Sequence, residues 1–379
     1  MDPTPRPSAG RGEPDAALHS VLRLCLVDGV GPRVQQTLVE RFGSAAGVLA
    51  ASPSELLATP GVGPKLARNL AQAREIDVHV ELSLCRQHRV QLIARESSAY
   101  PRMLKETADP PSLLYVRGEL VEADGLALAV VGSRRATHYG LRQSERLAGG
   151  LSRAGLTVIS GLARGIDAAA HRAALAAGGR TIAVLGCGLS HIYPPEHASL
   201  ADEVAGRGAV VTEMPMRREP RGGFFPQRNR IISGMSLGVL VVEASLKSGA
   251  LITARHAMEQ GRDVFAVPGP IDNPNSQGTN RLIADGAKLV QSVDDILDEL
   301  GPLVEATPGP GERTVHHPGE LQLNDLERRV LDLIETGPTD VNGVIASSGL
   351  PTQQVLSILT VLEMRRLVNR LSANVFSRR

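Results

Sequence analysis

The sequence is poor in aromatic residues and cysteine. Its 379 residues include no tryptophan, four tyrosines and five phenylalanines. The three cysteines, Cys25, Cys85 and Cys187, are far apart and match no metal-ligand spacing. An odd number of isolated cysteines is typical of buried thiols in a reducing compartment. We therefore expect neither disulfides nor a bound metal ion.

A long apolar run and an excess of one charge are also absent. No stretch approaches the roughly 18 apolar residues that read as a membrane-spanning helix, and the first residues lack the apolar core of a signal peptide. Lysine plus arginine number 41 against 40 aspartate plus glutamate, a net charge of +1. This balance excludes a surface that is basic all over. We expect a cytoplasmic protein without a membrane partner, in which any phosphate site is a local basic patch.

The composition is otherwise that of a folded protein with more than one domain. Apolar residues make up 42% and charged residues 21%, and the length favours two or three domains. Proline and glycine cluster near both ends of the chain and mark a tail and a linker. The predicted units are a tail (1–14), a helix-hairpin-helix domain (15–75), a connecting segment (76–110), a central domain (111–300), a linker (301–320) and a C-terminal domain (321–379).

The central domain alternates apolar strands with helices. The strands are continuously apolar, as expected where both faces of a sheet are covered. This order predicts a Rossmann-like, doubly wound parallel sheet in an α/β fold. Strands are expected near 126–131, 156–160, 181–186, 209–213, 238–243 and 263–267, with a shorter one near 288–291. Helices are expected near 138–154, 166–177, 196–206, 228–234, 250–260 and 279–285.

The helical N-terminal region contains two similar hairpins, at 28–32 and 59–64. Each places glycines before a proline at the first position of a helix. This pattern is typical of a helix-hairpin-helix, whose glycine amides can bind a phosphate, although a tight turn without a ligand has the same form. Lys65 and Arg68 follow the second hairpin and favour it. Gly61, Gly63 and Lys65 are therefore candidate duplex or phosphate contacts.

The C-terminal domain has the element order of a winged helix. Helices are expected near 325–335, 340–348 and 352–366, followed by an extended pair. The apolar stripe predicted for the last helix is Val355, Leu356, Leu359, Leu362 and Leu367. Its other face, up to Glu363, carries no cation, whereas a helix that reads a duplex groove usually carries arginine or lysine. We expect this domain to contact protein, or nucleic acid weakly through its wing.

Small and basic residues follow several of the predicted strands. Ser133 and Arg134 follow the first strand, and Gly161 and Arg164 follow the second. A third group, Lys247, Ser248 and Gly249, opens a helix. Small residues allow a phosphate to approach helix amides, and arginine can bind it in a bidentate manner. Alternatively, the glycines only close tight turns and the arginines face solvent.

The segment 217–230 combines charge with aromatic rings. It holds five arginines and one acid, a net +4 in a chain whose total is +1. A solvated loop is the usual explanation for such a run, but the Phe224-Phe225 pair is costly to expose. Rings beside guanidinium groups can hold the bases and phosphates of a single strand. We expect one ring to pack inward and Phe225 to be the platform. The candidate contacts are Arg221, Phe225, Arg228, Asn229 and Arg230.

Four acidic or histidine residues suggest an enzyme only weakly. His171 follows Asp167 by one helical turn, and Glu213 and Glu243 end strands. The chain has no G-x-S-x-G elbow and no histidine pair for a metal. We expect Asp167 to cap or orient, and both glutamates to hydrogen-bond to neighbouring loops. Gly186-Cys187-Gly188 is only half of a dinucleotide motif, so we expect no catalytic residue and no cofactor.

Taken together, these motifs resemble the DNA-processing protein A family, also called DprA/Smf. The resemblance covers about 100–287 and rests on YPRML, DPPSLLYVRG, VVGSRRAT, SGLARGIDAAAH, FPQRNRIISG, VVEASLKSGALITA, FAVPG and SQGTNRLIADGA. It implies a protein that binds single-stranded DNA, forms a homodimer and helps load the RecA recombinase during natural transformation. It places DNA contacts at Arg134, Arg221, Phe225, Arg228, Arg230 and Lys247. One departure is Glu196, where asparagine is expected.

Two other functions stay open at this point. Nucleotide hydrolases of the lysine-decarboxylase-like group resemble the predicted core, but their P-G-G-x-G-T-x-x-E signature is absent, since the chain has Pro268-Gly269-Pro270 in that place. An interaction scaffold that works through its two end domains is the other alternative.

Overall fold

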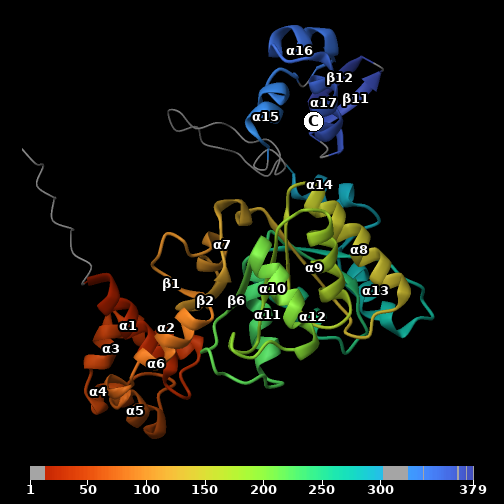
Figure 1. Ribbon diagram of the computed structural model, residues 1–379. Helices are drawn as coiled ribbons and strands as arrows, with labels where there is room; N and C mark the ends of the chain where they lie inside the picture. The colour runs from red at the N-terminus through yellow and green to blue at the C-terminus, as the bar shows by residue number, and fades with distance from the viewer. Residues whose placement is uncertain (1–12, 302–322, 336, 365–366, 373, 379) are drawn as a thin grey trace, which may run out of the picture.

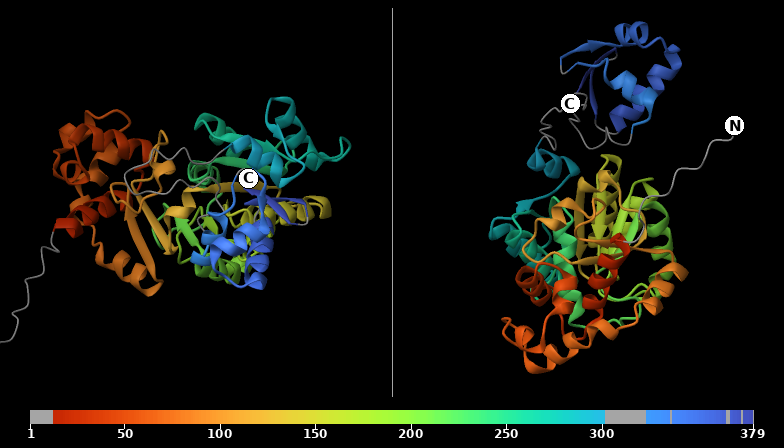
Figure 2. Two further views of the ribbon diagram at one scale, coloured as in Figure 1. Left: turned by 90° about the horizontal axis from the view of Figure 1, so that it is seen from above. Right: turned by 90° about the vertical axis from the view of Figure 1, so that its left-hand side faces the viewer.

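The computed structural model describes residues 13–301, 323–335, 337–364, 367–372 and 374–378. Most of the predicted tail (1–14) and linker (301–320) therefore lies outside the described residues. The predicted fold class is confirmed: a helical N-terminal domain, a central α/β domain and a small C-terminal domain follow one another along the chain (Figure 1). The first and last of these lie apart in both views of Figure 2.

A nine-stranded sheet forms the centre of the molecule, in the order β1-β2-β6-β5-β4-β3-β7-β8-β9. The seven strands from β6 to β9 in this order pair in parallel, whereas β1 and β2 are antiparallel additions at one edge. The strands are β1 (Val90–Ala94), β2 (Leu113–Gly118), β3 (Ala127–Gly132), β4 (Thr157–Ser160), β5 (Thr181–Val184), β6 (Ala209–Thr212), β7 (Gly238–Glu243), β8 (Asp263–Ala266) and β9 (Lys288–Leu289).

Helices cover both faces of the sheet because every central strand is apolar on both sides. Alternate residues of β3 enter two different cores, Ala129 and Val131 on one face and Leu128 and Val130 on the other, as the pleat requires. The first core includes α11 (Phe224–Gly234) and α12 (Ala250–Glu259). The second includes α8 (His138–Arg153), α9 (Ile166–Ala176) and α14 (Val293–Leu300). The remaining helices of this domain are α10 (Ala198–Arg207) and α13 (Gln277–Ala284).

The strand order reverses at the centre of the sheet. β3 pairs with β4 on one side and with β7 on the other, so the connections leave β3 and β7 in opposite directions. In open sheets of this kind, ligands bind beyond the carboxyl ends of the strands at such a reversal. The turns after β3 and β7 therefore form the first place to look for a site.

The antiparallel edge was not predicted. Residues 76–110, expected to be only a connecting segment, contain α6 (His79–Gln87), β1 and α7 (Arg102–Lys105). β1 pairs with β2, which pairs with β6 through Tyr115 opposite Thr212. The third core joins this edge to the N-terminal helices, because Leu22 of α1 (Glu13–Leu26) and Val78 pack in the same cluster as Leu113 and Tyr115. The N-terminal domain is thus packed against the sheet.

The N-terminal helices form the predicted pair of hairpins. α2 (Pro32–Phe42) and α5 (Pro64–Ala71) each begin with proline after an extended glycine N-cap, Gly31 or Gly63, that has no side-chain cap. Gly29 and Gly61, with φ of +94° and +81°, make the preceding turns, a backbone region that glycine adopts without penalty. α3 (Ala45–Ala50) and α4 (Pro53–Leu57) complete the domain around a core of its own.

The C-terminal domain is a winged helix. It consists of α15 (Asp325–Leu331), α16 (Val341–Ser348), α17 (Thr352–Met364) and a sheet of β10 (Thr339–Asp340), β12 (Val375–Arg378) and β11 (Val368–Ser372). One expected core residue was wrong: Leu356 is 44% exposed, and Ile358 is buried instead. Arg365 and Arg366 lie outside the described residues.

No single helix in the described ranges is long and apolar enough to cross a membrane. One bent pair, Val341–Ser348 with Thr352–Glu363 at 117°, passes on length and composition together. Both of its helices contribute buried side chains to the core of the winged helix.

Asp124 lies at the amino-terminal ends of the central strands, where it joins the start of β4 to the residue before β5. Its carboxylate accepts from Arg180 Nε and Nη2, both at 2.9 Å, and from Thr157 Oγ1 at 2.9 Å. Asp124→Ala removes the ion-pair partner of Arg180, which is 24% exposed and keeps only the carbonyls of Glu119 and Arg207, and we expect it to lower the free energy of unfolding in urea by about 2 kcal/mol. Arg102→Ala is the control, because its pair with Glu106 is exposed and contributes at most about 0.5 kcal/mol. Equal effects of the two substitutions would contradict this assignment.

Candidate nucleic-acid interface

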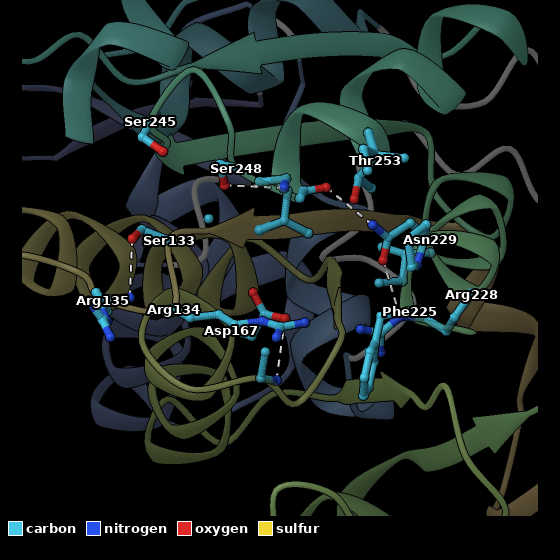
Figure 3. A pocket seen from close by; sticks show the side chains of 18 of the residues that line it. Ser133, Arg134, Arg135, Asp167, Phe225, Arg228, Asn229, Ser245, Ser248 and Thr253 are labelled. Atoms are coloured by element: carbon cyan, nitrogen blue, oxygen red, sulfur yellow. Dashed lines mark hydrogen bonds between the residues drawn. The ribbon is translucent and has the colours of Figure 1, made fainter. Parts of the chain in front are cut away.

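A cavity of about 770 Å³ opens at the reversal point of the sheet. The turn after β3, the loop after β7 and the first turns of α11 and α12 line it. Ser133 and Arg134 reach into the cavity from one side, and Phe225 with Arg228 from the other (Figure 3). Three of the segments singled out in the sequence, far apart along the chain, therefore meet in one place.

Two of the helix starts near the cavity are already occupied by acidic side chains of the protein. Glu243 Oε2 accepts from Thr137 Oγ1 at 2.8 Å and from the Thr137 amide at 3.2 Å, at the start of α8. Asp167 Oδ2 accepts from the amides of Gly161 and Ala163, just before α9. The expected roles of both residues in orienting neighbouring loops are confirmed. Burial raises the pKa of Asp167, and the nearby Arg228 charge acts in the opposite direction.

The starts of α11 and α12 line the same cavity. Within the described residues, no side chain caps either helix from its N-cap residue, Gly223 or Gly249, but Ser248 Oγ accepts from the Ala250 amide at 3.3 Å. The Ser248 amide donates to the Ser245 carbonyl, and Asn229 Nδ2 donates to the Gly249 carbonyl at 3.2 Å. Helix amides without a partner attract an anion. The Gly249 amide is therefore the candidate backbone donor for an anion at the start of α12.

Arg228 forms the floor of the cavity. It is 4% exposed, and its Nη1 donates to the carbonyls of Gly161 at 2.8 Å and of Val184. Burial lowers its pKa to about 10, so it remains cationic at neutral pH. A Cβ on Gly161 would lie 2.5 Å from Nη2 of Arg228. Gly161 is thus needed to admit the guanidinium group, and its amide is taken by Asp167 rather than left for a phosphate.

Arg230 is not where the sequence placed it. It is 5% exposed, does not line the cavity, donates from Nη2 to Glu213 Oε2, and has its Nε 3.5 Å from Asp109 Oδ2. A side chain two residues further along a helix points to nearly the opposite side. There Glu213 and Asp109 hold the Arg230 guanidinium. Burial raises the pKa of Glu213, and the Arg230 charge acts against this. The expected direct contact with DNA is replaced by a structural ion pair.

The two phenylalanines begin α11 instead of lying in a loop, and they separate. Phe225 lines the large cavity, whereas Phe224 lines a different one. The Arg134 guanidinium carbon lies 5.1 Å from the centroid of the Phe225 ring, within cation–π range. Arg134 itself is exposed, so the ring and the cation form one surface at the mouth of the cavity.

Tyr193 is a site residue that the sequence did not reveal. Its ring centroid lies 5.5 Å from that of Phe225 with an interplanar angle of 39°, and it lines the cavity. Gly186 leaves room for Phe225, because a Cβ there would lie 3.1 Å from the ring. The available signal was that Tyr193 is one of only four tyrosines.

The other predicted cations stand at the rim. Arg221 and Lys247 are exposed and do not line the cavity, but each directly precedes a residue that does, Gly222 or Ser248. Arg164 is also exposed, but its Nε pairs with Glu196, whose hydrogen bond raises the pKa of Arg164. A phosphate would therefore have to compete with Glu196 for Arg164.

The hairpin residues Gly61, Gly63 and Lys65 are exposed. The first hairpin, in contrast, faces the central domain, where Asp28 Oδ1 lies 3.2 Å from Arg218 Nη2. Only the second hairpin is thus open for a duplex or phosphate contact of the predicted kind.

The pair Asp167 and His171 has no catalytic geometry. Thr181 Oγ1 donates to the Val158 carbonyl at 2.7 Å and therefore accepts from His171 Nδ1 at 2.6 Å. His171 Nε2 is buried without a partner, and burial lowers the pKa of His171 to about 3. The imidazole is neutral and inaccessible. No group of three or more potential metal ligands occurs in the part of the chain that the structure describes.

Comparison with known proteins identifies relatives for each part of the chain. A family model described as DNA recombination-mediator protein A matches residues 91–301. Models described as the DprA winged helix domain and as a SAM-like helix-hairpin-helix tandem match residues 316–374 and 21–75. Protein Smf of Escherichia coli is 45% identical over 75% of this chain and 77% of its own length. Protein Smf of Synechocystis is 33% identical over 93% of this chain and 96% of its own length.

Two solved structures are similar to this one. DNA processing protein A from Streptococcus pneumoniae has a TM-score of 0.66 at 35% identity, covering 74% of this chain and 97% of that one. DNA processing protein A from Helicobacter pylori, described with its single-stranded DNA binding mode, has a TM-score of 0.50 at 30% identity, covering 55% and 95%.

The buried His171 predicts a measurable loss of stability in mild acid. In the native state its pKa is about 3, below the ordinary histidine pKa of 6.5, so between these values the unfolded chain binds a proton that the folded chain does not. The contribution of His171 to the free energy of unfolding is therefore fully present above pH 6.5. It falls as the pH is lowered, by about 1.4 kcal/mol per pH unit for one proton. Urea unfolding between pH 5 and 6.5 should show this slope in the wild type and not in His171→Gln. The same slope in both would contradict a neutral buried imidazole.

Proposed function

The chain belongs to the DNA recombination-mediator protein A family, DprA/Smf, and we propose that it binds single-stranded DNA in the cavity at the carboxyl ends of β3 and β7. The observation that carries the proposal is the convergence of Arg134, Phe225 and the start of α12 on one cavity. Cations, a ring face and helix amides are what a strand with exposed bases needs.

The residues in and around the cavity have different roles in this proposal. Arg134 and Lys247 neutralise phosphates together with the amide of Gly249, while Ser133 and Ser248 line the turns beside them. Phe225 takes a base, and Arg228 with Asn229 holds the floor in place. Arg164 and Arg221 add attraction at the rim, Gly161 makes room for Arg228, and Arg230 supports α11 from below.

We further propose that the protein acts in the cytoplasm as a homodimer that protects incoming single strands and helps RecA to assemble on them during natural transformation. Membership of the family supports this proposal. The second hairpin, with Gly61, Gly63 and Lys65, is proposed to contact duplex or phosphate.

Hydrolysis of nucleotides is the alternative function, and the site does not favour it. The loop after β8 carries Pro268-Gly269-Pro270 in place of the glycine-rich signature, and His171 is sealed from solvent. Release of free base from a nucleoside monophosphate by the purified chain would revive this alternative.

The salt dependence of binding tests the cavity. Each phosphate contact on a single strand contributes about 0.7 to the slope of log affinity against log salt. We expect Arg134→Ala and Lys247→Ala each to lower the slope by about 0.7, measured by fluorescence anisotropy with labelled oligothymidylate. Arg102 is an exposed cation on α7, so Arg102→Ala removes a charge without disturbing the fold and should leave the slope unchanged. Unchanged slopes for Arg134→Ala and Lys247→Ala would remove both residues from the site.

The proposed mediator role has its own measurement. Wild-type chain bound to single strands should raise the rate of DNA-dependent ATP hydrolysis by RecA when the strands are first coated with single-strand-binding protein. Phe225→Ala should lose most of this stimulation, because stacking contributes about 1–3 kcal/mol per base. Full stimulation by a variant that no longer binds single strands would refute the coupling of the two activities.

A further inference from the structure

A second cavity lies on the other side of α11, between the N-terminal domain and the sheet. It has a volume of about 340 Å³. Residues 29–32 of the first hairpin form one wall, and Glu213, Phe224 and Gln227 of the central domain form the other. In Figure 1 the N-terminal helices lie beside the β2–β6 edge of the sheet, where this cavity is found.

The two cavities are adjacent through a single helix. Phe225, Arg228 and Asn229 line the first, whereas Phe224 and Gln227 line the second. Successive residues of a helix point about 100° apart, so the first turn of α11 presents one ring to each cavity. The loop before α11 also borders both, with Pro220 and Gly222 at the first and Arg218 at the second.

We propose that the second cavity is a nucleotide subsite, in which a single strand that leaves the Phe225 cavity places a further base against Phe224. This inference rests on the proposed function. It gives the first hairpin a role in binding the single strand, distinct from the role in duplex or phosphate contact proposed for the second hairpin.

The lining of the second cavity favours a base over a phosphate. Its two acids, Asp28 and Glu213, are paired with Arg218 and Arg230, so the described lining carries no unpaired cation for a phosphate. Arg230 occupies Oε2 of Glu213 and leaves Oε1 able to accept from an exocyclic amino group, as acidic side chains do with cytosine. Gln227 on α11 and Gln35 on α2 supply amide groups beside the ring of Phe224. A ring and hydrogen-bonding groups in one cavity suit the face and the edge of a base.

The strand's phosphates have separate partners along the path. Arg221 is exposed in the loop that borders both cavities. Arg218 is 31% exposed and bridges the domains through Asp28, which is 82% exposed. The pair holds the hairpin wall in place while leaving the guanidinium accessible at the edge of the cavity.

Gly31 allows a test that does not disturb folding. It lines the second cavity, has extended backbone and would place a Cβ in open space. Gly31→Asp supplies α2 with a preferred N-cap residue and adds a negative charge to the cavity. Gly343→Asp is the matched control, because Gly343 lies in the first turn of α16, has open space around a Cβ and lines neither cavity, and an acid in the first turn of a helix is stabilising.

Affinity is measured for oligodeoxycytidylates, whose bases carry the exocyclic amino group, from about 4 to about 16 nucleotides, the range of site sizes of single-strand-binding folds. We expect Gly31→Asp to weaken the longest strands by about five- to a hundredfold, the equivalent of one stacked base, and to leave the shortest unchanged. Gly343→Asp should match the wild type at every length. Both variants should unfold at or above the wild-type temperature. No length-dependent loss in Gly31→Asp, or an equal loss in both variants, overturns the inference.

A second pair of variants separates this inference from the function on which it rests. Phe224→Ala should weaken only long strands, whereas Phe225→Ala should weaken all lengths. If Phe225→Ala weakens all lengths and Phe224→Ala none, the second subsite fails and the proposed function stands. If Phe225→Ala has no effect at any length, the proposed function fails.

Cys25 provides a readout inside the cavity without mutation. It lines the second cavity, while Cys85 and Cys187 are buried, and burial raises the pKa of Cys25 to about 11. Alkylation of the wild type by a neutral reagent should therefore be slow, and Cys25 should be slowed further by long strands and not by short ones. Equal rates with long and short strands would contradict entry of a base.

Discussion

The buried guanidinium of Arg228 is the interaction on which the site depends. It lies where β4 and β5 end and joins their loops by donating to the carbonyls of Gly161 and Val184. A buried cation is costly unless its donors are used and an opposite charge is near. Asp167 supplies that charge while its own oxygen is held by two loop amides. The cation, the acid and the glycine that admits them form one unit, so the shape of the cavity floor is fixed before any strand arrives.

Side chains of the protein also occupy part of the rim of the cavity. A doubly wound sheet directs several helix starts toward one edge, and each could attract an anion. Glu243 accepts from the start of α8 and Asp167 from the loop before α9, and Ser248 Oγ accepts from the first amide of α12. Side chains of the protein thus use several of the donors at this edge, and the exposed cations Arg134 and Lys247 carry its remaining positive charge.

The sequence predicts the fold well, because the central strands are apolar on both faces and glycines mark their ends. It predicts the antiparallel edge poorly, because β1 and β2 stand outside the alternation of strands and helices, and β2 pairs with β6 far along the chain. For the site, residue type and order were sufficient to bring Arg134, Phe225 and Ser248 together. The direction of each side chain was not predictable: Arg228 and Arg230 are two residues apart in one helix, yet one forms the cavity floor and the other an ion pair beneath it. Tyr193 was missed because its place depends on the course of a loop.

The contact of Arg134 with the Phe225 ring has a consequence for the free protein. A partly exposed aromatic ring at the mouth of a wide cavity adds to the apolar surface through which copies of a chain can aggregate. The guanidinium group lies over this ring and presents a hydrated charge outward. The guanidinium group thus covers the ring in the free protein, and a base that stacks on Phe225, as proposed above, would have to displace it.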